Sequence, residues 1–291
     1  MPADGASRFR AAAAARSYSH VSVTRPACPQ AAFVRRRLGK RGRWRQSRLV
    51  ASAVVTTTDT LLGGTLRLLQ PKVGYRVNVD SLLLVAFAGT RRVERVVDLG
   101  AGVGALGLLA LSRGLAKQAL LVEADPKLVA LAGENLRRGG FRGEALELDL
   151  ARQKLHGSAA PLVLCNPPYY PAHSHRPAQS PAKALARSGD VTPFLMAAST
   201  LVARKTGRAL FCYPAPQLPE LLVAATKVGL VAKRLRLVHA RGDQPARLAL
   251  VELRAARPGG LVVEPPLIEW IGRARSPELQ ALSGARAVDR R

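Results

Sequence analysis

Residues 96–104 read VVDLGAGVG. An apolar run that ends in a carboxylate and then in three closely spaced glycines is typical of a buried strand that turns sharply into a helix. Residues 105–113, ALGLLALSR, have the length and the apolar character of that helix. The free N–H groups at such a helix start favour a ligand that approaches the loop closely. The sequence therefore predicts a strand, loop and helix unit that binds a ligand.

Short apolar runs alternate with helix-length amphipathic stretches from residue 92 to residue 254. This alternation is typical of repeated β-α units around a parallel sheet. We predict an α/β fold with a seven-stranded, mostly parallel sheet, helices on both faces and an antiparallel hairpin at one edge. The expected strands are residues 92–98, 118–123, 145–149, 161–165, 208–213, 233–239 and 247–254. The expected helices are residues 105–113, 125–138, 192–205 and 217–228, and residues 80–87 capped by Asp80.

The chain has 291 residues and a formal net charge of +26, which favours a nucleic acid partner, although the excess of Arg over Lys also fits a biased genome composition. Twelve of the 45 Lys and Arg residues and one acidic residue lie in the first fifty positions. We divide the chain into a basic, disordered arm at 1–55, one domain at 56–270 and a polar basic tail at 271–291. The arm equally fits a transit peptide or an over-extended start.

Membrane insertion is not expected, because no apolar run reaches the roughly eighteen residues that a spanning helix needs. The three cysteines are far apart and lack the spacing of a zinc site. We therefore expect a cytoplasmic, metal-free monomer in a reducing compartment. Cys165 has no histidine base arranged beside it and is predicted to be a small buried apolar residue.

Two cofactor classes fit the glycine loop. Residues 102–107 satisfy G-x-G-x-x-G, so a nicotinamide or flavin dinucleotide has to be considered. The carboxylate of Asp98 would repel a pyrophosphate but attract the ammonium group of S-adenosylmethionine, which favours the sulfonium cofactor. Glu123, at the end of the next strand, suits the ribose hydroxyls of either cofactor, and Asp149 suits an adenine amino group. Asp98 and Asp149 could instead cap helices or turns. The expected cofactor ligands in this unit are Asp98, Gly100, Gly102, Gly104, Glu123 and Asp149.

The motif Asn166-Pro167-Pro168-Tyr169 directly follows the fourth expected strand. An amino group conjugated to a heteroaromatic ring is a weak nucleophile, because its lone pair is delocalised. The Asn166 side-chain oxygen and the Pro167 carbonyl can each accept one N–H of such an amine and draw the lone pair out of conjugation. The two prolines fix these acceptors in advance, and Tyr169 offers a stacking face. A rigid Asn-Pro turn is the alternative interpretation.

The penultimate strand and the turn after it are basic. Lys233, Arg234, Arg236, Arg241 and Arg247 fit either a solvated face or a track for RNA phosphates. Two histidines in the Pro-rich loop, at positions 173 and 175, could touch RNA or be solvated.

These residues together resemble class I S-adenosylmethionine-dependent methyltransferases that act on amino groups. Residues 71–88 and 237–267 are similar to the bacterial enzymes that methylate N6 of adenosine 37 in valine tRNA, and the resemblance covers about residues 57–270. It implies S-adenosylmethionine as cofactor and tRNA as partner. In that family the Gly-Tyr-Arg-x-x-x-Asp segment closes over the cofactor, so the resemblance makes Asp80 a further cofactor neighbour.

The chain departs from that family at Ser188, where the family often carries a histidine. Related enzymes with the same tetrapeptide modify guanine N2 in rRNA, adenine N6 in DNA or glutamine in release factors. The motif therefore indicates an amino-group acceptor more firmly than it indicates the polymer. A non-catalytic RNA-binding protein with a vestigial cofactor site is the alternative outside the enzyme class.

Overall fold

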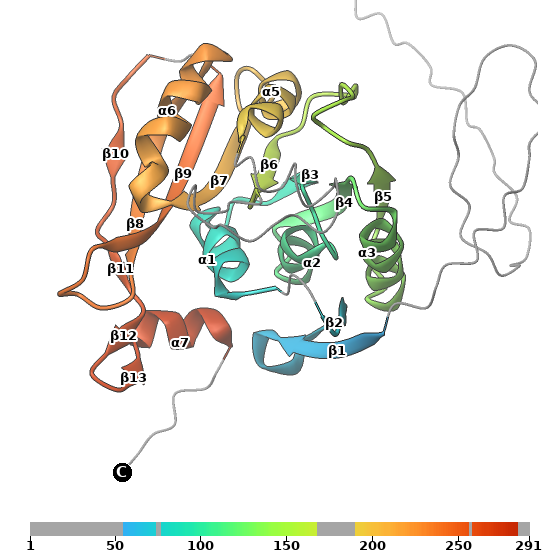
Figure 1. Cartoon of the computed structure of the whole chain (residues 1–291), viewed down its shortest axis with the longest axis horizontal. Coiled ribbons are helices and arrows are strands. Elements are labelled where there is room, and N and C mark those ends of the chain that lie inside the picture. The colour runs from blue at the N-terminus through green and yellow to red at the C-terminus, as the bar shows by residue number, and fades with distance from the viewer. Residues whose placement is uncertain (1–54, 74–76, 168–189, 256–257, 285–291) are drawn as a thin grey trace, which may run out of the picture. The chain divides into compact units, whose positions relative to one another are not determined.

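A computed structural model describes residues 55–73, 77–167, 190–255 and 258–284. Its centre is one mostly parallel sheet, ordered β10-β8-β9-β7-β6-β3-β4-β5 with β11 beside β8 (Figure 1). The parallel strands are β3 (Val93–Leu99), β4 (Ala116–Glu123), β5 (Gly143–Glu147), β6 (Leu162–Cys165) and β7 (Arg208–Pro214). The strands beyond β7 are β8 (Leu230–His239), β9 (Ala246–Ala255), β10 (Val262–Val263) and β11 (Leu267–Ile268).

The structure confirms the α/β fold and all seven expected strands, with boundaries within three residues. The strand number and the edge were wrong, because the described sheet has nine strands and the antiparallel β8–β9 pair does not end it. After β9 the chain returns along β8, where the backbone N–H of Glu264 donates to Leu235 and that of Glu269 donates to His239. These bonds satisfy edge groups of β8 that would otherwise face solvent unpaired.

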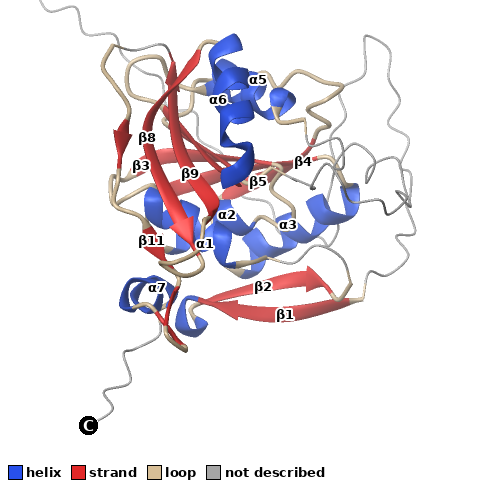
Figure 2. Cartoon of the chain, turned by 60° about the vertical axis from the view of Figure 1, so that its left-hand side comes forward, coloured by secondary structure: helices blue, strands red, loops and turns tan. Residues whose placement is uncertain are grey.

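Helices cover both faces of the sheet (Figure 2). One face carries α1 (Val79–Phe87), α2 (Ala105–Ser112) and α3 (Pro126–Arg138), and the other carries α5 (Thr192–Leu201) and α6 (Leu218–Lys227). Each face has its own apolar core, the first around Leu84, Leu109 and Leu121 and the second around Leu195 and Phe211. All five of these side chains have at most 1% of their surface exposed.

Two helix ends differ from the expectation. Helix α1 is capped by Asn78, not by Asp80, because the Asn78 side chain accepts the N–H of Asp80 at 3.1 Å. Helix α5 ends at Leu201, before the expected Lys205. Beyond this point the N–H of Ala203 donates to the carbonyl of Ala160, which lies outside the helix. The cap of α3 is confirmed: Asp125 accepts the Lys127 N–H at 2.8 Å.

The residues before α1 form a hairpin of β1 (Thr56–Leu61) and β2 (Leu66–Pro71), joined by the short 3₁₀ helix η1 (Leu62–Gly64). Buried Asn135 of α3 anchors it: the amide accepts the Leu69 N–H at 2.7 Å and donates to the carbonyls of Leu69 and Val103 at 3.0 Å. An appendage packed on the sheet domain was expected here. The same side chain ties this appendage to the glycine loop.

The tail expected from residue 271 is wrong as far as residue 284. The chain there forms the hairpin β12 (Trp270–Ile271) and β13 (Ala274–Arg275), followed by α7 (Pro277–Ser283). Ser276 caps α7, and Leu279 is 2% exposed against the first apolar core. Burial of Leu279 binds this segment to the domain. The expected basic arm lies almost wholly outside the described residues and stays a prediction.

Candidate active site

The carboxyl ends of β3, β4 and β6 meet at one edge of the sheet. Leu99, the last residue of β3, pairs with Val122 of β4 on one side and with Cys165 of β6 on the other. Neighbouring strands lie about 4.8 Å apart, so Asn166, which follows β6, is adjacent to Gly100 on the neighbouring chain segment. The expected cofactor loop and the expected acceptor motif therefore share one site.

The glycine loop is shaped by contacts that exclude side chains. Gly104 is the N-cap of α2 with φ +89°, and a Cβ there would lie 2.8 Å from Cδ1 of Leu121. Gly102 has φ +57° with nothing within 4 Å of its Cβ position, so the loop faces open space at that point. At Gly107 a Cβ would lie 2.3 Å from Leu121, so only glycine lets α2 pack this closely on the sheet. From the sequence, Gly107 was identified only as the last glycine of the G-x-G-x-x-G pattern, and its packing role was not predicted.

Asp98 is a fully buried acid at the centre of this edge. Its Oδ2 accepts the N–H of Gly107 at 2.9 Å, and among the described residues Oδ1 has no hydrogen-bond partner. The pKa of Asp98 is raised from 3.8 to about 7; burial is the largest cause, the charge of Glu123 also raises it, and the Gly107 N–H lowers it. A buried carboxylate oxygen without a donor is complementary to a cationic group. The site therefore fits the ammonium group of S-adenosylmethionine.

Glu123 lies at the mouth of the glycine loop, at the end of β4. Its Oε2 accepts the Gly102 N–H at 2.8 Å, and its Oε1 accepts the N–H groups of Ala124 and Asp125 at 2.8 and 3.0 Å. Backbone donors thus fix the orientation of this carboxylate. Each carboxylate oxygen has two lone pairs, so Oε2, which receives one N–H, can still accept from a ribose hydroxyl.

The other two expected cofactor acids have protein partners. Asp149, two residues beyond β5, accepts the Ala151 N–H at 3.0 Å and pairs with Arg152 at 3.4 Å. These contacts are those of a residue that caps a turn, which was the alternative interpretation of this acid. The Asp80 carboxylate receives the Asn78 amide at 2.8 Å and the Arg247 guanidinium at 2.8 Å. The structure thus gives both acids structural partners, and their contact with the cofactor stays a prediction.

The acceptor motif is described only at its start. Asn166 is half-buried with its Oδ1 buried, Pro167 is buried, and Pro168 and Tyr169 lie outside the described residues. Cys165 is fully buried as expected, and burial raises the pKa of its thiol. The ring of Phe194, in the first turn of α5, lies 3.0 Å from where a Cβ on Gly100 would be. The sequence analysis missed this aromatic neighbour, whose only signal was its place early in the helix after the motif.

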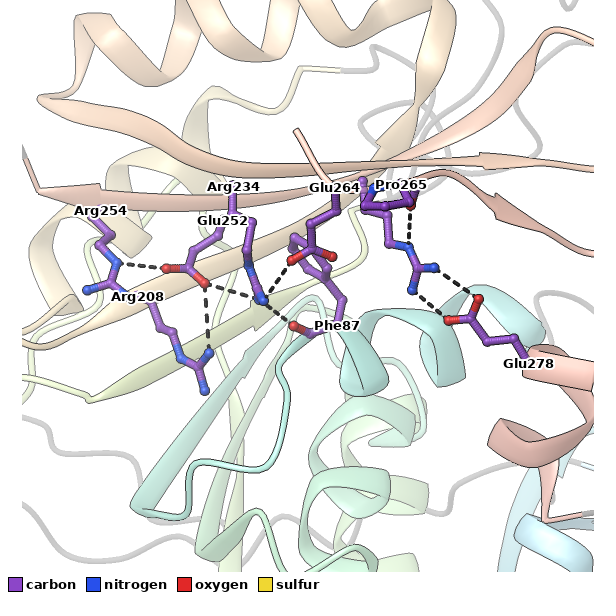
Figure 3. A network of polar contacts seen from close by, with 9 residues as sticks. Phe87, Arg208, Arg234, Glu252, Arg254, Glu264, Pro265 and Glu278 are labelled. Atoms are coloured by element: carbon purple, nitrogen blue, oxygen red, sulfur yellow. Dashed lines mark hydrogen bonds and ion pairs between the residues drawn. The ribbon is translucent and has the colours of Figure 1, made fainter. Parts of the chain in front are cut away.

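The cations of the penultimate strand are bound within the protein, which corrects both interpretations for Lys233, Arg234 and Arg236, whereas Arg241 in the turn after the strand is exposed and has no carboxylate partner among the described residues. Arg234 contacts Glu252 at 3.2 Å and Glu264 at 3.1 Å, and its guanidinium stacks 4.1 Å from the ring centre of Phe87 (Figure 3). Arg236 forms a bidentate pair with Glu278 at 2.7 and 2.9 Å. The remaining three also bind within the protein: Lys233 to the carbonyls of Pro258 and Gly259, Arg241 to that of Gly272, and Arg247 to Asp80 and Glu269.

Glu252 is the centre of this network. It is 4% exposed and also receives Arg254 at 2.7 Å and buried Arg208 at 3.8 Å (Figure 3). A buried carboxylate needs cationic or donor partners to offset its desolvation. The arginines of β8 and β9 therefore hold the antiparallel end of the sheet together.

Comparisons with known proteins agree with this geometry. Residues 75–190 match the family model described as "Methyltransferase small domain". A predicted O-methyltransferase from Agrobacterium tumefaciens has the same fold, with TM-score 0.54, 23% identity, and 72% of this chain and 97% of that chain covered. The sheet order, the buried acid before the glycine loop and the family match define a class I S-adenosylmethionine-dependent methyltransferase.

Within that class the chain is similar to two proteins named tRNA1(Val) (adenine(37)-N6)-methyltransferase. The protein from Tolumonas auensis is 28% identical over 223 residues, which is 74% of this chain and 90% of the relative. The protein from Aeromonas hydrophila is 29% identical over 182 residues, which is 61% of this chain and 76% of the relative.

No helix in the described residues is long and apolar enough to cross a bilayer. They also contain no group of three or more His, Cys, Asp or Glu side chains that could hold a metal ion.

Proposed function

We propose that this protein methylates the N6 amino group of an adenosine in tRNA, with adenosine 37 of valine tRNA as the target. The observation that carries the proposal is the register of β3 and β6, which brings Asn166 and Pro167 next to the glycine loop that follows Asp98. The names and the 25–32% identity of the similar proteins support tRNA as the polymer.

The acceptor side of the site needs hydrogen-bond acceptors more than a base. The Asn166 Oδ1 and the Pro167 carbonyl each accept one N–H of the target amine, which directs its lone pair toward the methyl donor. Tyr169 provides a stacking face for the splayed base. Because Asn166 and Pro167 directly follow β6, their acceptor groups orient the amine before the reaction.

The cofactor side holds the methyl donor by charge and hydrogen bonds. S-adenosylmethionine supplies an electrophilic methyl group when it is bound. Asp98 receives the ammonium group, and Glu123, already oriented by three backbone N–H groups, accepts from a ribose hydroxyl. The amine nitrogen would gain the methyl group as the sulfur–methyl bond of the cofactor breaks and its electron pair stays on sulfur. The amine then loses one proton to solvent, so no side chain has to act as a strong base.

The test is incubation of the protein with methyl-labelled S-adenosylmethionine and unmodified total tRNA, followed by nucleoside mass spectrometry. Asn166→Ala removes one acceptor. The matched control Gln153→Ala removes an exposed amide from the segment between β5 and β6. We expect labelled N6-methyladenosine from the wild type and from Gln153→Ala, and a loss of at least about 100-fold in Asn166→Ala with cofactor binding retained.

Two results would contradict the proposal. Full activity in Asn166→Ala would mean that this side chain does not orient the amine. No labelled nucleoside from tRNA, with the cofactor still bound, would exclude tRNA, and rRNA, DNA and release-factor peptides would then be tested in that order.

A further inference from the structure

An aromatic and basic surface lies at the end of β8, outside the site described above. We call it the hairpin patch and define it as Arg241, Trp270, Ile271, Arg273 and Arg275. Trp270 is 39% exposed and Ile271 is 62% exposed, which is unusual for such large apolar side chains next to each other. Together with the turn at Arg241 they line a surface hollow of about 420 Å³. Small-molecule sites span about 300–1,000 Å³, so the hollow can take a nucleotide.

The charges of the hairpin patch are not neutralised as those of β8 are. Arg241 binds the carbonyl of Gly272, and in the part of the chain that the structure describes Arg273 and Arg275 form no ion pair. One acid, Asp243, lines the same hollow. The guanidinium of Arg275 lies 5.9 Å from the ring centre of Trp270. Three cations near one exposed indole produce a positive field that attracts a polyanion.

The hairpin patch lies on the same edge of the sheet as the acceptor motif. β11 pairs with the carboxyl end of β8, and β9 begins opposite the carboxyl end of β7, which neighbours β6. From β6 to β11 the sheet advances four strands, or about 20 Å at 4.8 Å per strand. A polymer with its target base at Asn166 reaches the patch by extending that distance along the edge.

The hairpin is held rigidly at its base. Buried Glu269 accepts two hydrogen bonds from Arg247, at 2.5 and 2.7 Å, and its carbonyl accepts the N–H of Ser276. The N–H of Trp270 donates to the carbonyl of Ala240 at 3.0 Å. A surface that is already ordered loses less conformational entropy when it binds.

We infer that the hairpin patch binds the RNA substrate beside the target nucleotide. Trp270 stacks on an unpaired base, and Arg241, Arg273 and Arg275 contact the flanking phosphates. Aromatic faces interleaved with cations are what single-stranded RNA requires, since each base offers a face and each linkage a charge. The inference deepens the proposed function and rests on its assignment of RNA as the acceptor.

The experiment measures binding of an end-labelled, unmodified valine tRNA transcript to the full chain by filter binding over a salt series. Trp270→Ala is expected to bind about 5- to 150-fold more weakly, and Trp270→Phe to recover most of that loss. The double variant Arg273→Ala/Arg275→Ala is expected to lower the slope of log K against log salt by about 1.4–1.8. The matched control, Arg138→Ala/Arg142→Ala, removes two exposed arginines where α3 leads into β5, at the opposite edge, and is expected to bind within about twofold of the wild type.

The outcomes separate this inference from the proposed function. If the wild type methylates tRNA and Trp270→Ala binds it equally tightly, the hairpin inference is wrong and the proposed function stands. If the wild type binds tRNA without methylating it, and Trp270→Ala weakens that binding, the hairpin inference stands and the proposed function is wrong. If the wild type binds no tRNA, or the patch instead captures a release-factor peptide, RNA docking at the hairpin is wrong.

Discussion

Replacing Asp98 by Asn should make the stability of the cofactor-free protein rise with pH relative to that of the wild type, because the wild type loses stability and the variant does not. Burial and Glu123 raise the pKa of Asp98 from its usual 3.8 to about 7, so the folded wild type retains a proton that the unfolded chain has lost. Between these two values the stability of the wild type falls with pH by about 1.4 kcal/mol per pH unit. An asparagine amide carries no charge at any of these pH values, so the stability of the Asp98→Asn variant has no such dependence on pH.

The magnitude follows from the pH window. From pH 5 to pH 7 the wild type loses about 2 kcal/mol relative to Asp98→Asn, and above pH 7 the difference levels off. The Asn amide also buries two N–H groups at a position where Oδ1 of Asp98 has no hydrogen-bond partner among the described residues, which costs about 1–3 kcal/mol at every pH. The pH-dependent part of the difference therefore isolates the carboxylate.

The assay is urea unfolding of both proteins without cofactor at pH 5, 6, 7 and 8. Asp243→Asn, which removes an exposed carboxylate, is the matched control for the loss of one charge. Saturating S-adenosylmethionine is expected to stabilise the wild type and to leave Asp98→Asn unchanged, because only the wild type offers the ammonium group a carboxylate. A stability difference that stays constant from pH 5 to pH 8 would refute the reasoning.

Three further predictions concern contacts that join distant segments. Arg247→Ala leaves the buried carboxylates of Asp80 and Glu269 without their cation and should lower the unfolding free energy by about 3 kcal/mol in urea, an expectation that an unchanged midpoint would contradict. Asn135→Ala leaves buried backbone groups of β2 and of the glycine loop unpaired, which should cost about 2–4 kcal/mol in thermal unfolding; a loss below about 1 kcal/mol would mean that water replaces the amide. Gly107→Ala forces a Cβ against Leu121 and should cost about 1–3 kcal/mol and weaken cofactor binding in calorimetry, whereas wild-type affinity would show that the sheet accommodates the methyl group.

Local sequence patterns were sufficient to predict the main strands and helices and the residues at the centre of the site. Apolar periodicity located the seven main strands, and Asp125 and Pro126 located the start of α3, because strand and helix periods and caps depend on neighbours a few residues apart. The placement of Asp98 and Asn166 on one edge also followed from the sequence, since parallel strands align their carboxyl ends.

Partners of charged side chains could not be predicted in this way. The ion pair of Asp80 joins residues 167 positions apart, and Arg234 meets Glu264 only because the chain doubles back along β8. A count of basic residues therefore left β8 open as either a solvated face or an RNA track, although its arginines are paired with carboxylates within the fold. Arg273 and Arg275, which have no carboxylate partner among the described residues, lie on a hairpin that the sequence analysis had assigned to a tail.

The fold class, the glycine loop after Asp98 and the acceptor motif after β6 can all be predicted from contiguous residues. Which charges remain available to a ligand depends on the folded chain. Whether a side chain is neutralised depends on what packs against it from elsewhere in the chain, and burial, which raises the pKa of Asp98, is likewise a property of the whole fold.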